Sequence, residues 1–238
     1  MSLVFVNSFD RSVLAFVNQF AQRSRVFDAF VVLIDGENLL KGGSMMALYW
    51  WAWFRRDERQ DRREYLLFTM IAGVFSILVA RTLAAVLPFR TRPVFDTSLS
   101  FRIPYSFNTY WLINWSSFPS DHATLFFCLA AGLWFVSRRL SLIAMAQTFF
   151  IITLPRVYLG IHFPTDVIAG GVLGIAMAST AQLTQLRERV TWYPRAWLQK
   201  YPAWFYGAMF AYSFETAELY ASARAVGRAL WLGARRLL

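Results

Sequence analysis

The chain has 238 residues but contains only one cysteine, Cys128, and only two histidines, His122 and His162. A single cysteine excludes an intrachain disulfide and a metal site built on cysteine ligands. Charged residues make up only 16% of the chain and hydrophobic residues 57%, which is too apolar for an ordinary soluble domain. Glycine, proline and serine are too scarce for a disordered chain. The composition therefore favours a single-domain helical membrane protein.

Acidic residues are also few, 14 against 24 lysines and arginines, so the formal net charge is +10. Such an excess can indicate a nucleic-acid partner, but here the basic residues cluster at the ends of apolar runs. This placement is typical of loops that orient a protein in a bilayer. We therefore expect membrane lipids as partners and no nucleic acid.

The apolar runs predict an all-α bundle with about six membrane-spanning helices. A further amphipathic helix, with phenylalanines and valines spaced three and four residues apart in 8–25, is expected to lie on the membrane surface. Another amphipathic helix is expected near the C-terminus. These features divide the chain into an N-terminal helix (1–25), a six-span core (26–190) and a C-terminal extension (191–238). The expected spans lie within 26–43, 42–54, 65–89, 123–136, 140–154 and 166–183.

Arginine clusters in 55–63, 138–139 and 187–195 would all lie on one side of the membrane if the spans alternate in direction. The positive-inside rule makes that side cytoplasmic. The segments 88–118 and 156–166 would then face the opposite, periplasmic side of a bacterial inner membrane. Each segment brings one of the two histidines to that side, so the sequence predicts one shared site.

Both histidines occur beside a Phe-Pro pair, in "FPSDH" (118–122) and in "HFPTD" (162–166). Proline is favoured in the first turn of a helix, so each junction is expected to be a helix N-terminus. Free backbone N–H groups and the helix dipole make such an end a site for anions. Ser120 would add a hydroxyl, although a capping role alone also explains this serine.

Arginines surround the two junctions: Arg81 and Arg156 lie in apolar runs, and Arg90 and Arg92 lie between them. An arginine in a membrane helix must face a polar cavity, and its planar donors match phosphate oxygens. His162 and Asp166, four residues apart, can pair so that one ring nitrogen is left as a nucleophile. This inventory suits phosphoryl transfer through a phosphohistidine.

These residues resemble the motifs of the membrane-bound type-2 phosphatidic acid phosphatase superfamily, which shares its fold with vanadium haloperoxidases. Its second motif, Pro-Ser-Gly-His, corresponds to residues 119–122, where Asp121 replaces the glycine. Its third motif, Ser-Arg-x5-His-x3-Asp, corresponds to residues 155–166, with proline in the first position. The variant with Asp121 is similar to that of members acting on undecaprenyl pyrophosphate.

The first family motif, Lys-x6-Arg-Pro, matches only at its end, Arg92 and Pro93, because Ala85 stands where the lysine is expected. Arg81 and Arg90 are both candidates to supply the missing cation. The resemblance implies that His162 attacks phosphorus, Asp166 orients His162, and His122 protonates the leaving group. It also implies a phosphate cradle, whose members are Arg81, Arg90, Arg92, Ser120, Asp121 and Arg156.

The resemblance therefore implies an integral membrane hydrolase that cleaves a lipid phosphate or pyrophosphate without a metal or other cofactor. Undecaprenyl pyrophosphate, phosphatidic acid and phosphatidylglycerol phosphate are the expected substrate classes, and the sequence leaves the oligomeric state open. A lipid phosphotransferase would use the same residues. A haloperoxidase is disfavoured by the apolar runs, and an anion transporter by the absence of the inverted repeats that transporters show.

Overall fold

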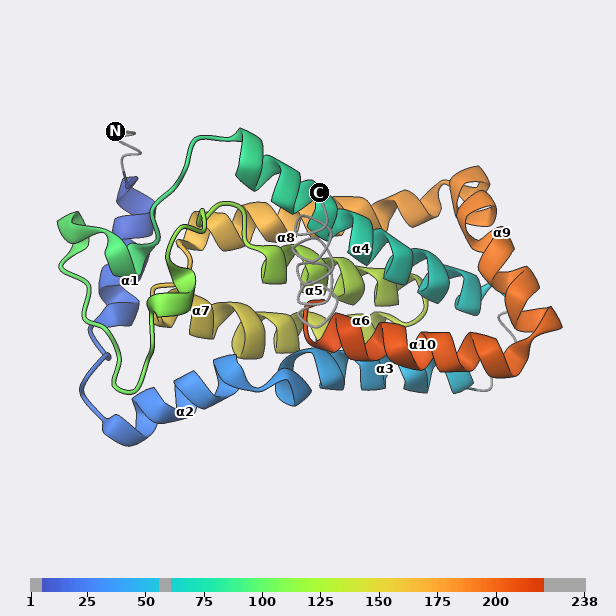
Figure 1. The fold of residues 1–238 in the computed structure, drawn as a ribbon, viewed down its shortest axis with the longest axis horizontal. Helices are drawn as coiled ribbons and strands as arrows, with labels where there is room; N and C mark the ends of the chain where they lie inside the picture. The colour runs from blue at the N-terminus through green and yellow to red at the C-terminus, as the bar shows by residue number, and fades with distance from the viewer. Residues whose placement is uncertain (1–5, 56–60, 221–238) are drawn as a thin grey trace, which may run out of the picture.

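The computed structural model describes residues 6–55 and 61–220, and this part consists of helices and loops without any strand, as the sequence predicts (Figure 1). Two π-helical segments, η1 (Leu39–Gly43) and η6 (Thr148–Thr153), connect α2 to α3 and α6 to α7. The helices are α1 (Ser8–Asn18), α2 (Arg25–Gly36), α3 (Ser44–Phe54), α4 (Arg62–Val86), α5 (Asp121–Gly132), α6 (Arg138–Gln147), α7 (Leu154–Tyr158), α8 (Pro164–Ser179), α9 (Thr184–Lys200) and α10 (Pro202–Ala217).

Three helical stretches are long and apolar enough to cross a bilayer: Arg62–Val86, Arg138–Tyr158 and Pro164–Gln182. A fourth apolar helix, Asp121–Phe135, is shorter. These stretches agree with four of the expected spans and identify the chain as a membrane protein. The expected total of six spans is not reached by helix length alone.

The region expected to hold the first two spans forms one rod instead of a hairpin (Figure 1). α2 packs beside α7 while α3 packs beside α6, so α2, η1 and α3 continue in one direction, antiparallel to the stretch from α6 to α7. The helix is interrupted at Glu37, whose backbone is extended. Lys41 Nζ donates to the Asp35 carbonyl oxygen, and Gln147 donates to the Lys41 carbonyl oxygen at 2.8 Å. These side chains supply hydrogen bonds to backbone carbonyl oxygens near the interruption, and the chain continues in the same direction without a turn.

The core of the bundle is the packing of α5 against α8 and α4. Gly170 and Gly174 lie where α8 meets α5, and a Cβ atom on either would overlap the α5 backbone carbonyl oxygens of Ser120 and Thr124. This is the small-residue face expected for close helix packing. The contact brings the beginnings of α5 and α8, and hence the two Phe-Pro junctions, next to each other.

Replacing Gly174 with leucine is therefore expected to push α5 and α8 apart, at a cost of about 3 kcal/mol or more. The purified variant should unfold at a clearly lower temperature in a thermal scan and lose any activity of the site. Gly207→Ala is the matched control, because a Cβ atom at Gly207 meets nothing within 4 Å. Equal melting temperatures for the Gly174→Leu variant and the wild type would contradict this packing role.

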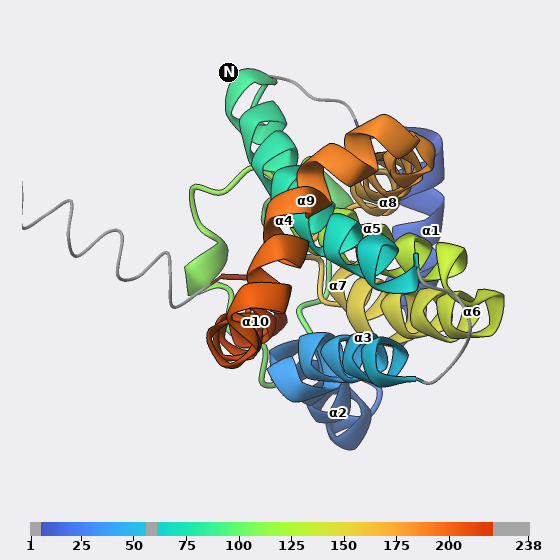
Figure 2. The same cartoon turned by 90° about the vertical axis from the view of Figure 1, so that its right-hand side faces the viewer.

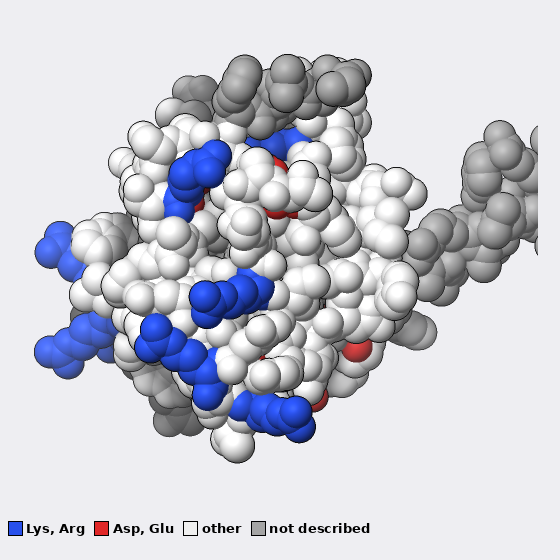
Figure 3. Space-filling model, turned by 90° about the vertical axis from the view of Figure 1, so that its left-hand side faces the viewer, with Lys and Arg blue, Asp and Glu red and all other residues white. Residues whose placement is uncertain are grey.

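α1 lies across one end of the bundle, where it contacts α7 and α8 (Figure 1). Phe9, Phe16 and Phe20 are exposed, with 50%, 65% and 42% of their surface free, while Asp10 and Leu14 are buried. An apolar outer stripe on a helix that crosses the ends of the spans is typical of an interfacial helix. The same end of the molecule also exposes lysine and arginine side chains (Figure 3).

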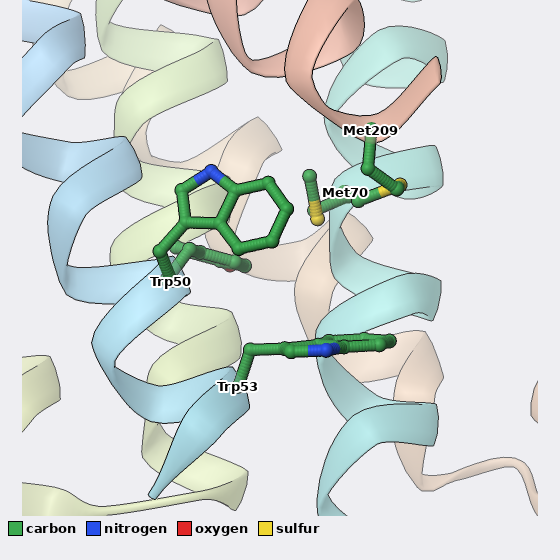
Figure 4. A pocket seen from close by; sticks show the side chains of 5 residues that line it. Trp50, Trp53, Met70 and Met209 are labelled. Atoms are coloured by element: carbon green, nitrogen blue, oxygen red, sulfur yellow. The ribbon is translucent and has the colours of Figure 1, made fainter. Parts of the chain in front are cut away.

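The C-terminal part contains two helices where one amphipathic helix was expected. α9 crosses the opposite end of the bundle, from α8 to α10, and α10 then runs back along α3 (Figures 1 and 2). Trp50 Nε1 donates to Ser213 Oγ at 3.1 Å, and Trp53 Nε1 donates to Tyr206 Oη at 3.3 Å. Figure 4 shows the two indoles with Met70 and Met209 between α3, α4 and α10. α10 is thus a packed helix of the bundle; residues 221–238 lie outside the described part.

Candidate active site

A cavity of about 520 Å³ opens between α4, α5, α7 and the loop that precedes α5. It has a cationic floor and an apolar rim. A neighbouring cavity of about 220 Å³ shares several of its residues. The residues that line the larger cavity are Arg81, Arg92, Trp111, Leu112, Trp115, Asp121, His122, Arg156, His162 and Leu219. Both histidines of the chain therefore face one cavity, as the sequence predicts.

Ser120 connects the two junctions through its backbone and caps α5 through its side chain. Its N–H donates to the Asp166 carbonyl oxygen at 3.1 Å, and its hydroxyl accepts from the Ala123 N–H at 3.4 Å. Ser120 is completely buried and does not line the cavity. The structure therefore gives it the capping role, and its predicted contact with phosphate remains a prediction.

His162 is held mainly by a backbone carbonyl. Its Nδ1 lies 2.8 Å from the Ser117 carbonyl oxygen, to which it donates, and 3.7 Å from Asp166 Oδ2. The direct bond expected between His162 and Asp166 is therefore long. Asp166 Oδ2 is already used, because it accepts from the Phe163 N–H at 2.8 Å and from the Ser117 hydroxyl. The carbonyl of Ser117, a residue that carries no motif, fixes the tautomer and leaves Nε2 as the free nitrogen.

Burial lowers the pKa of His162 below its ordinary value, and the charges of Arg92 and Arg156 act in the same direction. Asp166 opposes this shift without reversing it. The His162 imidazole is therefore neutral at neutral pH, so Nε2 keeps its lone pair. Burial, followed by repulsion from Arg156, also lowers the pKa of Arg92 to about 10, so Arg92 stays charged.

Arg156 joins the second histidine to a carboxylate on α2. Its Nη2 lies 3.0 Å from His122 Nε2, and its Nε lies 3.2 Å from Asp35 Oδ1. Because a guanidinium can only donate, His122 Nε2 is the acceptor and carries no proton in this state. Asp35 was not singled out from the sequence. A carboxylate inside an apolar run was the available signal.

The other three arginines have different surroundings. Arg81 forms an ion pair with Asp121 and lies over the Trp115 ring, 4.9 Å from its centroid. It therefore reaches the cavity from α4, where the family lysine is missing. Asp121 neutralises this arginine, which is a different role from the phosphate contact predicted for it.

Arg92 lines the cavity, but its donors hold backbone carbonyl oxygens of Ile161, Trp115 and Ser116 at 2.7, 3.2 and 3.4 Å. Arg90 does not line the cavity. It lies behind Asp166, between that carboxylate and Asp10. Of the two candidates for the missing cation, the structure thus brings Arg81 to the cavity and takes Arg90 away from it.

Within the described ranges, 6–55 and 61–220, no three histidine, cysteine, aspartate or glutamate side chains are grouped as a metal site would require. The cavity instead gathers three guanidinium groups around two imidazoles. Such donors fit an anion with several oxygens.

The sequence model of the PAP2 superfamily matches residues 64–189, which include both histidine junctions. The chain belongs to the PAP2 superfamily. Among its PAP2 relatives, YbjG of Escherichia coli, described as a candidate undecaprenyl-diphosphatase, is 29% identical over 64% of this chain and 71% of its own length. The lipid A 1-diphosphate synthase of Escherichia coli is 25% identical over 76% of this chain and 78% of its own. The crystal structure of LpxE from Aquifex aeolicus has the same fold, with 19% identity, a TM-score of 0.53, and coverage of 75% of this chain and 97% of that one.

Proposed function

We propose that this PAP2 protein is a membrane enzyme that hydrolyses a lipid phosphate or pyrophosphate through a phosphohistidine at His162. The observation that carries the proposal is the His162 ring, which Ser117 holds by Nδ1 on the wall of a cavity floored by arginines. A neutral imidazole with one free nitrogen is a nucleophile, and guanidinium groups stabilise the charge on a phosphoryl group in transfer.

In the first step, His162 Nε2 forms a bond to phosphorus while the bond from phosphorus to the lipid oxygen breaks. His122 gives a proton to the leaving oxygen. His122 can hold that proton once substrate is bound, because a phosphate anion stabilises the imidazolium and draws the Arg156 Nη2 donor to its own oxygens. In the second step water attacks phosphorus, His122 takes the proton of that water, and phosphate leaves His162.

Apolar residues in the cavity lining are the evidence that the proposed substrate is a lipid. Trp111, Leu112, Trp115 and Leu219 line the same space as the arginines, so an apolar chain can leave the site beside a phosphate. The similarity to YbjG favours undecaprenyl pyrophosphate, and phosphatidic acid and phosphatidylglycerol phosphate are the other two classes to test.

The test is release of inorganic phosphate from each of these three lipids by the purified full chain in detergent, with a metal chelator present. We expect release from at least one lipid and no loss of rate on chelation, since the proposed chemistry uses histidines and arginines only. An absence of release from all three lipids by folded protein would refute the proposed hydrolysis. Full inhibition by the chelator would refute the metal-free mechanism.

Lipid phosphotransfer is the second candidate, and the similarity to the lipid A 1-diphosphate synthase favours it. The same phosphohistidine would then pass its phosphoryl group to a lipid phosphate instead of to water. Adding lipid A with a radiolabelled donor separates the two candidates. A labelled lipid product indicates transfer, whereas labelled free phosphate indicates hydrolysis.

We also propose that the site faces the periplasm, because residues 55 and 61–63, the start of α6 and α9 carry the arginine clusters at the other end of the bundle. Cys128 is completely buried, so a cysteine introduced at an exposed position is the only one that a reagent reaches. In intact spheroplasts, Thr97→Cys at the site end is expected to react with a membrane-impermeant maleimide, and Gln185→Cys at the other end is not. The reverse labelling pattern would invert the orientation.

A further inference from the structure

A buried carboxylate on α1 contacts the region that supports His162. Asp10 is fully buried although α1 crosses the end of the bundle. Its Oδ1 accepts from the Thr165 N–H at 2.9 Å, and its Oδ2 accepts from the Thr165 hydroxyl at 2.6 Å. A carboxylate withdrawn from water needs a cation as well, and Arg90 Nη2 supplies it at 2.7 Å.

Arg90 continues the chain of charges to Asp166. Its Nη1 pairs with Asp166 Oδ1 and also donates to Thr165 Oγ1 at 2.9 Å. Its guanidinium covers the Phe163 ring, 4.1 Å from the centroid, so its position is fixed from three directions. Asp166 in turn lies 3.7 Å from His162 Nδ1. Asp10, Arg90, Asp166 and His162 therefore form one row of alternating charge that ends at the imidazole.

We propose that Asp10 and Arg90 are positioning residues for His162, and that their charges set the protonation of its imidazole through Asp166. Neither residue touches the cavity, so neither is a catalytic residue. The proposal deepens the proposed function and rests on it for the role of His162 as the nucleophile. The measurement below needs no turnover, so it can fail or succeed independently of any phosphatase activity.

The sign of each effect follows from the charge behind the imidazole. Asp10, Arg90 and Asp166 together carry one negative charge, which favours the imidazolium. Asp10→Asn makes the row neutral, so the pKa of His162 should fall. Arg90→Gln leaves two negative charges, so the pKa should rise. The double variant carries one negative charge again, so its pKa should lie between those of the two single variants and close to the value of the wild type. Shifts of about half a pH unit or more are expected for the single variants.

Other charged groups that act on His162 remain unchanged in these variants. These groups are Arg92 in the loop before α5, Arg156 in α7 and the titratable His122 in α5. Their contribution is a constant background, so the differences between variants report on the row alone.

The experiment uses the two-histidine composition of the chain. Full-length protein labelled with ¹³C and ¹⁵N histidine gives two imidazole signals, and His122→Gln assigns them. The signal of His162 is titrated in micelles for the wild type, Asp10→Asn, Arg90→Gln, the double variant and Arg90→Lys. Arg90→Lys keeps the positive charge and should therefore keep the titration midpoint of His162. If Asp10→Asn does not fold, the comparison of Arg90→Lys with Arg90→Gln is sufficient to test the proposal.

Asp28→Asn is the matched control. Asp28 is also a fully buried carboxylate, but it accepts from the Tyr158 hydroxyl and from the N–H groups of Gln22 and Tyr105, outside the row. Opposite shifts for Asp10→Asn and Arg90→Gln, with no shift for Asp28→Asn, support the proposal. Unchanged midpoints, or shifts in the same direction, overturn it and leave Asp10 as an anchor of α1 only.

Discussion

Replacing His162 with alanine is expected to reduce phosphate release by about 10³-fold or more, because the variant lacks the imidazole that the proposed mechanism uses as the nucleophile. Incubating the variant with ³²P-labelled lipid substrate and denaturing it in alkali should leave no label on the protein. The wild type should retain label that is lost on brief acid treatment, as expected for a phosphohistidine. Labelling of the alanine variant would contradict the assignment of His162 as the nucleophile.

His122→Ala gives the contrasting result that separates the two histidines. Its turnover should fall by about 10²- to 10⁴-fold, the range found for a lost general acid or base. His162 remains, so label should still reach the protein with pyrophosphate substrates, whose leaving group needs less protonation. The label should then persist, because no base activates the water. Equal label decay in His122→Ala and in wild-type protein would remove this role from His122.

Changes at Arg156 are also expected to reduce activity strongly. Arg156 is 4% exposed and lines the cavity, and its guanidinium contacts His122 and Asp35 at the same time. Arg156→Lys keeps the charge but cannot keep both contacts and still offer a forked donor to phosphate. We expect kcat/KM to fall by about 10²- to 10³-fold, the loss seen when one donor to a developing oxyanion is removed.

Arg195→Gln is the matched control for Arg156→Lys. Arg195 pairs with Glu64 at 3.2 Å near the other end of the bundle, and 47% of its side chain is exposed. Its loss should change kcat/KM by less than twofold, since Arg195 does not line the cavity. Steady-state kinetics of both variants in the same micelles measure the contrast. A wild-type rate for Arg156→Lys would show that charge alone suffices at this position.

Local patterns predicted most of the fold. The apolar runs led to α4, α5 and α8. The spacing of Gly170 and Gly174 is typical of close helix packing, and the structure identifies α5 as the partner helix. The prediction of two separate spans within 26–43 and 42–54 was wrong, because these segments continue in one direction. A hydrogen bond from the Lys41 side chain to the Asp35 carbonyl oxygen lies at the interruption between them. That bond depends on where the two segments lie in space, which the pattern "GENLLKGG" does not specify.

The candidate site likewise contains residues that sequence motifs predicted and residues that they did not. The two histidines, Asp166 and Arg156 carry motifs at fixed spacing, so the sequence identified them together. Ser117 was missed because its backbone, and not its side chain, holds His162. Any residue has a carbonyl oxygen, so no residue type could reveal this contact.

Arg90 was interpreted as a phosphate ligand because it lies close to Arg92 in the sequence. Its actual partner Asp10 is 80 residues away along the chain. Contacts of this length depend on the packing of α1 against α8, and the residue types alone do not encode them.

The contact between Asp10 and Thr165 also constrains the order in which the protein can mature. These residues are 155 positions apart, so the ribosome makes α1 long before its partner exists. Until α8 has been synthesised and inserted, the Asp10 carboxylate has neither the Thr165 N–H nor a settled Arg90 to hold. A chain interrupted before α8 therefore lacks Thr165 and Asp166, on which the support of His162 depends. The site is completed only when the first and the last thirds of the polypeptide meet in the membrane, and incomplete translation products stay inactive.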